Sequence, residues 1–256
     1  MKSRDIILTI CLASAPLSSC GGDANVADCE EGKKQIPCSE RTKEEEARKA
    51  LDEGDLDTAI ALLTELIAEE PDNYGRNPLL GAAYASRAGF DILNVAKAKF
   101  SSGGSLLEQM TTFLPDPADK GAAGYDLSLG DMKSSVGVLR LIPADKLSDV
   151  TAEKYAASAV LQLTLYQAAY SIMYLNKFAI SATTGQVDLG QLATMTDADA
   201  LIILENLAAA GQIPGAEDPA LQARVNEALA DIRTQDGTTD RDRLRAFVAK
   251  EQAPPP

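Results

Sequence analysis

The residue types that most often carry enzyme chemistry are sparse in this chain. It contains no histidine, which removes Ser-His and Cys-His catalysis and the commonest protein ligand of transition metals. Glu69 and Glu70 could serve a glycosidase, but two acids at the end of a helix are usually solvated. Asp116 and Asp119 lack the spacing of a calcium loop. We therefore predict no catalytic residue, metal site or cofactor, and a cell-wall hydrolase is the least favoured function.

The cysteines are the other reactive residues, and one of them indicates location. Lys2 and Arg4 precede an apolar run from Ile6 to Leu17, which is typical of a signal peptide. The run ends in Leu-Ser-Ser-Cys20, which resembles the lipobox of bacterial lipoproteins. That resemblance implies that residues 1–19 are removed, that Cys20 is lipidated, and that the protein is anchored to the periplasmic face of the outer membrane. An ordinary secretory signal with an incidental cysteine is the alternative.

Residues 20–42 are polar and glycine-bearing, which is typical of a flexible tether. Cys29 and Cys38 lie inside this segment, and an even pair in an oxidising periplasm favours a disulfide. A two-cysteine metal site is the alternative, but no histidine exists to complete it.

The segment from Ala47 to Phe100 has the clearest helical periodicity. Its apolar residues recur at helical spacing: Leu56, Ala59, Ile60, Leu63, Leu66 and Ile67. A turn at Gly54-Asp55 separates this helix from a shorter one before it, and Pro71 ends it. These features predict two helices packed as a hairpin.

This hairpin resembles a tetratricopeptide repeat. In that register Ala59 takes the small-residue position, Leu63 and Leu66 the packing positions, and Pro71 the closing proline. The next unit continues the pattern with Leu80, Gly81 and Tyr84. Lys43 departs from the family, which carries a large aromatic residue there. A plain helical hairpin in an unrelated bundle is the alternative.

We predict an all-α domain over residues 43–251, in which repeat-like hairpins pack with a bundle around a long central helix. That helix should span Thr151 to Ile180. It carries a row of tyrosines, which either pack against polar groups or line a cleft: Tyr155, Tyr166, Tyr170 and Tyr174. Residues 252–256 should be a disordered tail.

Other segments are predicted from local signals. Proline, glycine and aspartate between Leu114 and Asp131 predict an irregular connection, followed by a helix from Leu129 to Leu141. The tetrapeptide Pro-Ala-Asp-Lys occurs at 117–120 and 143–146, and we expect both copies to connect helices. Thr196 with Asp199 predicts a capping box. Two further helices are expected over 219–234 and 240–250.

The net charge of −14 argues against nucleic acid as a partner and leaves the lipid anchor as the only membrane contact. We expect a protein–protein interaction scaffold that binds other envelope proteins through its repeat surface. The layout also resembles the lipoprotein T-component associated with tripartite (TRAP) transporters. That resemblance implies an accessory ligand-binding role, a ligand passage lined by the tyrosine row, and a possible homo-oligomer.

Overall fold

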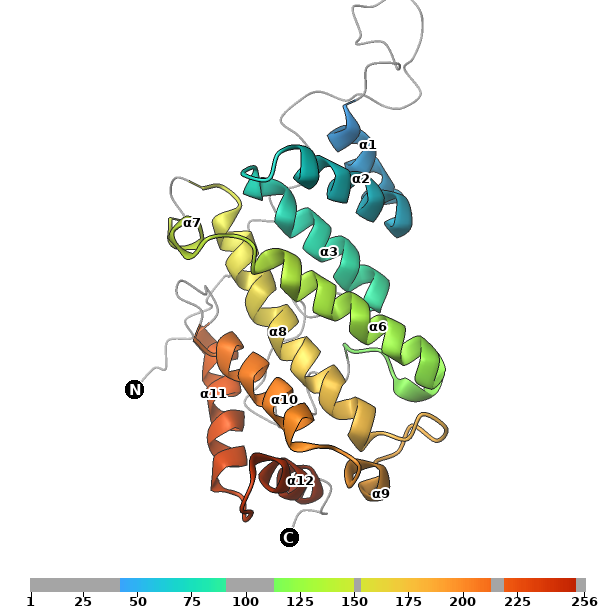
Figure 1. Ribbon diagram of the computed structural model, residues 1–256, viewed down its shortest axis with the longest axis vertical. Helices are drawn as coiled ribbons and strands as arrows, with labels where there is room; N and C mark the ends of the chain where they lie inside the picture. The colour runs from blue at the N-terminus through green and yellow to red at the C-terminus, as the bar shows by residue number, and fades with distance from the viewer. Residues whose placement is uncertain (1–41, 91–112, 150–152, 213–218, 252–256) are drawn as a thin grey trace, which may run out of the picture. The chain divides into compact units, whose positions relative to one another are not determined.

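The computed structural model describes residues 42–90, 113–149, 153–212 and 219–251 (Figure 1). Within these ranges every regular element is a helix, and the only β contact is an isolated bridge between Ile180 and Val187. The predicted all-α class is confirmed. One compact unit begins at Lys43. Residues 1–41 and 252–256, and with them the predicted signal peptide, most of the tether and the tail, lie outside the described residues.

The chain of this unit begins with three short helices, whose bounds are α1 Lys43–Glu53, α2 Leu56–Glu69 and α3 Asn77–Ala88. Gly54 joins α1 to α2 with a φ of 76°, a left-handed conformation that glycine adopts without strain. The Asp55 carboxylate then caps α2 by accepting a hydrogen bond from the Thr58 amide. The predicted turn at Gly54-Asp55 is confirmed.

The prediction of an irregular connection before residue 131 is wrong. Helix α6 spans Pro117–Leu139, with one non-helical residue, Gly121, at a φ of 65°. Asp116 caps the first turn of α6. Proline is tolerated in this turn because a backbone N–H there would have no partner within the helix. Further along, Tyr125 and Leu129 are buried in the core. Their burial offsets the low helix propensity of the neighbouring glycines.

The two Pro-Ala-Asp-Lys copies also differ from expectation. Pro117 is the first residue of α6, and Pro143 is the N-cap of the short helix α7, Ala144–Ser148. Each tetrapeptide therefore forms the start of a helix and is not merely a connection. The fixed φ of proline suits this position.

The predicted long central helix is α8, Ala156–Ala179, the longest helix in the described part of the chain. It packs against α6 on one side and against α10, Asp197–Ala210, on another. Core residues lie all around it, including Ala159, Leu163 and Ile172. A helix buried on most of its faces is the central element of its domain.

The C-terminal part closes the bundle with α9 Leu189–Leu192, α11 Pro219–Thr234 and α12 Asp240–Glu251. The predicted capping box is confirmed, because the Thr196 hydroxyl and the Asp199 carboxylate each accept from the other's amide. The helices predicted over 219–234 and 240–250 are also confirmed. No helix among the described residues combines the length and apolar character that a membrane crossing requires.

The apolar core has two parts. The larger joins α3, α6 and α8 to α10, α11 and α12, and the smaller lies between α1, α2 and α3. The smaller core is built from Ala47, Ile60, Leu63, Leu80 and Ala83. Helix α3 contributes to both, because Leu80 and Ala83 belong to one and Ala85 and Ala88 to the other.

Candidate functional site

Of the positions predicted to pack the repeat, Leu63 and Leu80 belong to the small core. Ala59 and Leu63 are fully buried, and Leu66 and Leu80 nearly so. Pro71 is exposed, just after the C-cap residue Glu70 of α2. These placements show a helical hairpin whose second helix, α2, also packs against α3.

Gly81 and Tyr84 occupy different surroundings. A Cβ on Gly81 would lie 3.2 Å from Leu139 Cγ, and the Ser135 hydroxyl donates to the Gly81 carbonyl at 2.8 Å. Gly81 therefore allows α3 to lie close to α6. Because α2 also packs against α3, this contact connects the hairpin to the bundle. Tyr84 is half-buried, and the Arg87 guanidinium lies 5.4 Å from its ring centroid.

Lys43, the departure from the repeat pattern, has a defined role in the structure. Its ammonium contacts Glu65 at 2.7 Å and Glu69 at 2.6 Å, so it joins the start of α1 to the end of α2. The hydrogen bonds to Glu65 and then Glu69 raise the pKa of Lys43. This ion pair therefore links the two helices of the hairpin.

Arg76 is a buried residue that sequence reasoning missed. Its guanidinium donates to the Leu66 carbonyl at 2.8 Å and contacts Glu70 at 2.9 Å and Glu44 at 3.3 Å. It therefore joins both helices of the hairpin to the turn before α3. A charged side chain this deeply buried is stable only when it is paired and hydrogen-bonded. No local signal distinguishes it from an exposed arginine.

Arg87 makes the corresponding connection at the other end of α3. It contacts Asp131 of α6 with two nitrogens, at 2.7 and 2.9 Å, and Asp57 of α2 at 2.6 Å. The hydrogen bonds to Asp131 are the main reason why its pKa is raised. A bidentate arginine–carboxylate pair fixes orientation as well as contributing energy.

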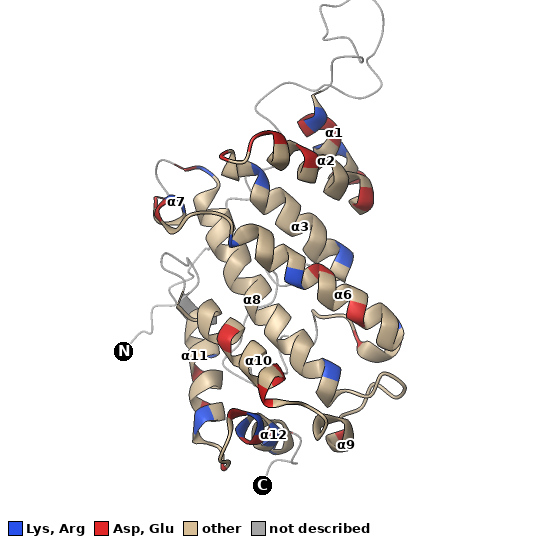
Figure 2. Ribbon diagram, viewed as in Figure 1, with Lys and Arg blue, Asp and Glu red and all other residues tan. Residues whose placement is uncertain are grey.

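The hairpin carries a large surplus of negative charge. Residues 43–76 contain eleven acidic and four basic side chains, which is half of the net charge of the whole chain. All four basic residues are already engaged in ion pairs within the unit: Lys43, Arg48, Lys49 and Arg76. The exposed carboxylates of Glu46, Asp52 and Asp72 have no ion pair with any residue in the described ranges. Figure 2 shows the acidic residues gathered along α1, α2 and the turn after α2.

The tyrosine row lies mainly within the core. Tyr166 is buried and meets Phe90 edge-on, with ring centroids 5.7 Å apart. Tyr170 is also buried, and its ring centroid lies 5.9 Å from that of half-buried Tyr174. Tyr155 is half-buried and packs against the large core. None of the four lines either of the two cavities described below.

The phenol groups of this row are held neutral by their surroundings. Burial raises the pKa of Tyr166 and of Tyr170. Burial, followed by the hydrogen bond that its hydroxyl donates to Asp199 at 2.9 Å, raises the pKa of Tyr174 to about 12. The row therefore packs and positions helices, and no member is poised to lose a proton near neutral pH.

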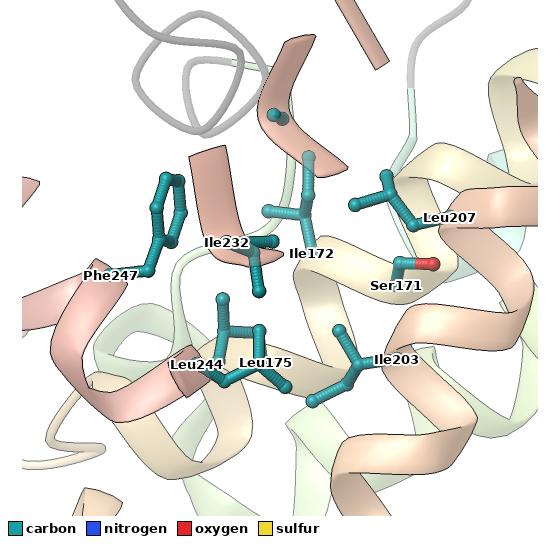
Figure 3. A pocket seen from close by; sticks show the side chains of 9 residues that line it. Ser171, Ile172, Leu175, Ile203, Leu207, Ile232, Leu244 and Phe247 are labelled. Atoms are coloured by element: carbon teal, nitrogen blue, oxygen red, sulfur yellow. The ribbon is translucent and has the colours of Figure 1, made fainter. Parts of the chain in front are cut away.

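A small apolar cavity of about 30 Å³ lies between α8, α10, α11 and α12 (Figure 3). Its labelled walls are hydrocarbon apart from Ser171, whose hydroxyl donates to the Gln167 carbonyl at 2.9 Å. A space of this size admits one or two water molecules but offers them almost no hydrogen-bonding partner. It does not fit a metabolite.

A second, more polar cleft of about 210 Å³ lies between α10, α11 and α12. Its charged walls are Glu205, Arg233, Asp240 and Arg243, and Arg243 contacts Asp240 at 3.1 Å. Sites for small molecules are usually between about 300 and 1,000 Å³ and mostly apolar. This cleft is smaller than that range and carries balanced charge.

The chemistry expected of Cys20, Cys29 and Cys38 lies outside the described residues. Within the described ranges, no group of three or more cysteine, aspartate and glutamate side chains is placed to hold a metal ion. Comparison with protein-family models, with curated proteins and with solved structures gave no match for this chain.

Proposed function

We propose that this protein is a membrane-tethered adaptor of the bacterial envelope whose acidic hairpin binds a basic segment of another protein. The acidic hairpin is the unit of α1, α2 and the following turn, residues 43–76. The observation that carries the proposal is its unbalanced charge on a hairpin that is joined by a small core and by ion pairs. A fixed array of carboxylates attracts a basic partner and sets its orientation.

The charge surplus is costly for the fold itself, which supports a role in binding. Like charges close together destabilise a compact state. The hairpin uses its few basic residues internally, at Lys43 and Arg76 among others, and leaves exposed acids such as Glu46 and Asp52 unpaired with any described residue. A basic partner would relieve the repulsion that remains.

The membrane tether rests on the sequence. The lipobox-like ending at Cys20 supports lipidation, and several acyl chains on one cysteine give a lasting anchor. Cys20→Ala should move the protein from the membrane fraction to the soluble periplasm. A variant that stays in the membrane pellet would contradict the anchor.

The partner is tested by crosslinking in intact cells. A photoreactive residue at Ala61, exposed on α2, should capture one or a few envelope proteins, identified by mass spectrometry. Glu46→Lys with Asp52→Lys should reduce this capture at least fivefold. The matched control is Asp119→Lys with Asp236→Lys, the same charge change at exposed sites elsewhere on the unit. Equal capture by both double variants would rule out the acidic hairpin as the binding surface.

The accessory role in solute transport is the competing proposal, and a binding screen of the purified protein tests it. The two cavities of the described residues, about 30 and 210 Å³, are small for a metabolite. A thermal-shift screen of small metabolites against the purified protein should therefore give no ligand. A clear shift together with no captured protein would favour the transport role over the adaptor.

A further inference from the structure

The outward face of α6 carries an apolar stripe without a described partner. It consists of five residues separated by three, four, three and four positions, which we call the α6 seam: Leu127, Gly130, Ser134, Gly137 and Leu141. This spacing keeps one side of a helix in line, as in the contact line of paired helices. Leu127 is 74% exposed and Leu141, in the turn that follows the helix, is 64% exposed. They are the two most exposed large apolar side chains in the described ranges.

The glycines of the seam have no explanation among the residues that the structure describes. Gly130 and Gly137 stand inside a helix, where glycine is disfavoured more than any residue except proline. A Cβ at either position would meet no atom of the described ranges within 4 Å. Gly81 provides the contrast, since Leu139 leaves it little room. The two exposed glycines instead leave space for the close approach of a group outside the described residues.

The order of residue types along the seam is the same in both directions: Leu, Gly, Ser, Gly, Leu. A second α6 helix running antiparallel would place each leucine near the opposite leucine, each glycine near a glycine, and Ser134 near its own copy. A two-fold axis requires this kind of self-complementary surface. Binding of a basic peptide or of an unrelated helix would not require a self-complementary surface.

Charges beside the seam agree with the same arrangement. Asp126 and Arg140 lie along the same side of the helix by the 3.6-residue repeat, near opposite ends of the seam. In an antiparallel pair each Asp126 lies near the partner's Arg140, and this contact occurs twice. Within the chain Asp126 contacts Lys177 and Arg140 contacts Asn206. Lys133 lies between them and would face its own copy.

We propose that the α6 seam binds the α6 seam of a second copy of this chain, forming an antiparallel two-fold dimer. The inference is independent of the acidic hairpin and of its partner. The seam is only about 21 Å long at 1.5 Å per residue, so the interface is at the small end of specific contacts. The dimer should therefore form in a concentration-dependent way.

Sedimentation velocity of the purified full-length chain, under reducing conditions, tests the dimer. The parent should shift from monomer to dimer with concentration. Gly130→Gln with Gly137→Gln should weaken dimerisation at least tenfold without lowering the melting temperature, because glutamine favours a helix and no described atom blocks it. Lys133→Ala should strengthen it about twofold. Leu201→Glu on α10, at a residue that is 51% exposed, is the matched control and should leave dimerisation unchanged.

The charge pairs offer a complementation test. Asp126→Arg and Arg140→Asp should each weaken the homodimer, because each creates two like-charge contacts. An equimolar mixture of the two variants should restore dimers, because both contacts are again between opposite charges. A monomeric parent at every concentration, or equal losses for Leu201→Glu and the glycine variants, would overturn the proposal.

Cysteine crosslinking tests whether the two α6 helices run antiparallel. The parent protein, which has its own cysteines, gives the background level of crosslinking. Ser134→Cys should give dimers on oxidation, whereas Ser148→Cys on exposed α7 should stay at background. Leu127→Cys and Leu141→Cys should crosslink when mixed and only weakly when alone. Strong crosslinking of either variant alone would indicate parallel helices and contradict the antiparallel dimer.

Discussion

The acidic hairpin and the bundle of α6, α8 and α10 to α12 are stabilised in different ways. The hairpin has a small core and relies on ion pairs, above all those of Lys43 and Arg76. The bundle has a continuous apolar core around α8. In its last segment, residues 219–251, six acidic residues are balanced by six basic ones.

This difference indicates that the part of the unit with the larger apolar core is not the part with the most strongly charged surface. Where apolar area is plentiful, charges can be balanced and dispersed. Where it is scarce, ion pairs join the helices, from the buried Arg76 to the largely exposed Lys43, and the surplus acids remain outside. The comparison suggests that the bundle supplies most of the folding free energy, while the hairpin supplies the charged surface.

The largest expected effect is in the bundle core. Leu244 is fully buried and lines the small apolar cavity (Figure 3). Leu244→Ala would enlarge that cavity and should lower the free energy of unfolding by about 3 kcal/mol. Denaturant melts give the value. Leu189→Ala, at a residue that is 55% exposed, is the control and should cost less than about 0.5 kcal/mol. Similar costs for both variants would contradict the core assignment.

The next effect concerns packing inside the hairpin. Ala59 is fully buried in α2, whereas Ala61 on the same helix is exposed. Ala59→Leu should overpack the contact and cost about 1–3 kcal/mol, and Ala61→Leu should be close to neutral. Urea melts of the two variants measure this. If Ala59→Leu were harmless, the hairpin would be loosely packed and the repeat register misassigned.

The ion pairs of the hairpin come third. Arg76→Met removes the contacts to Glu44 and Glu70 and leaves the Leu66 carbonyl with the Glu70 amide as its remaining donor, at a cost of about 1.5 kcal/mol. Arg48→Met removes only a pair with Glu44 one helical turn away and should cost about 0.4 kcal/mol. Equal losses in urea melts would show that burial of Arg76 adds nothing.

The smallest expected effect comes from removing the charge of Asp199 in the bundle. Asp199 is desolvated, but hydrogen bonds from Thr196 and Tyr174 outweigh this and lower its pKa. A lowered folded pKa contributes stability above the unfolded value, about 3.9, which is lost as the pH falls through the folded value. Asp199→Asn should therefore cost about 0.5–1 kcal/mol at pH 7 and less at pH 2. Urea melts at both pH values check this, and a cost independent of pH would exclude a role for the charge.

Local signals were enough to determine several elements of this protein from its sequence. The turn at Gly54, the capping box at Thr196 and Asp199, and the amphipathic pattern of 219–234 each depend on residues within a few positions of one another. Helical periodicity also identified α8 as central, because a helix that is apolar on most faces must be surrounded. The all-α class follows from these elements together.

Contacts between residues distant in the sequence determined the features that local signals did not predict, namely the helix α6 and the roles of Arg76 and Arg87. A glycine- and proline-rich stretch forms α6 because the core buries Tyr125 and Leu129. The free energy gained from this burial depends on distant residues, so helix propensity and turn signals do not include it. Arg76 and Arg87 became ties between helices because their carboxylate partners come from other parts of the chain. Burial and ion pairing depend on which segments meet in space, so only the tertiary structure could show them.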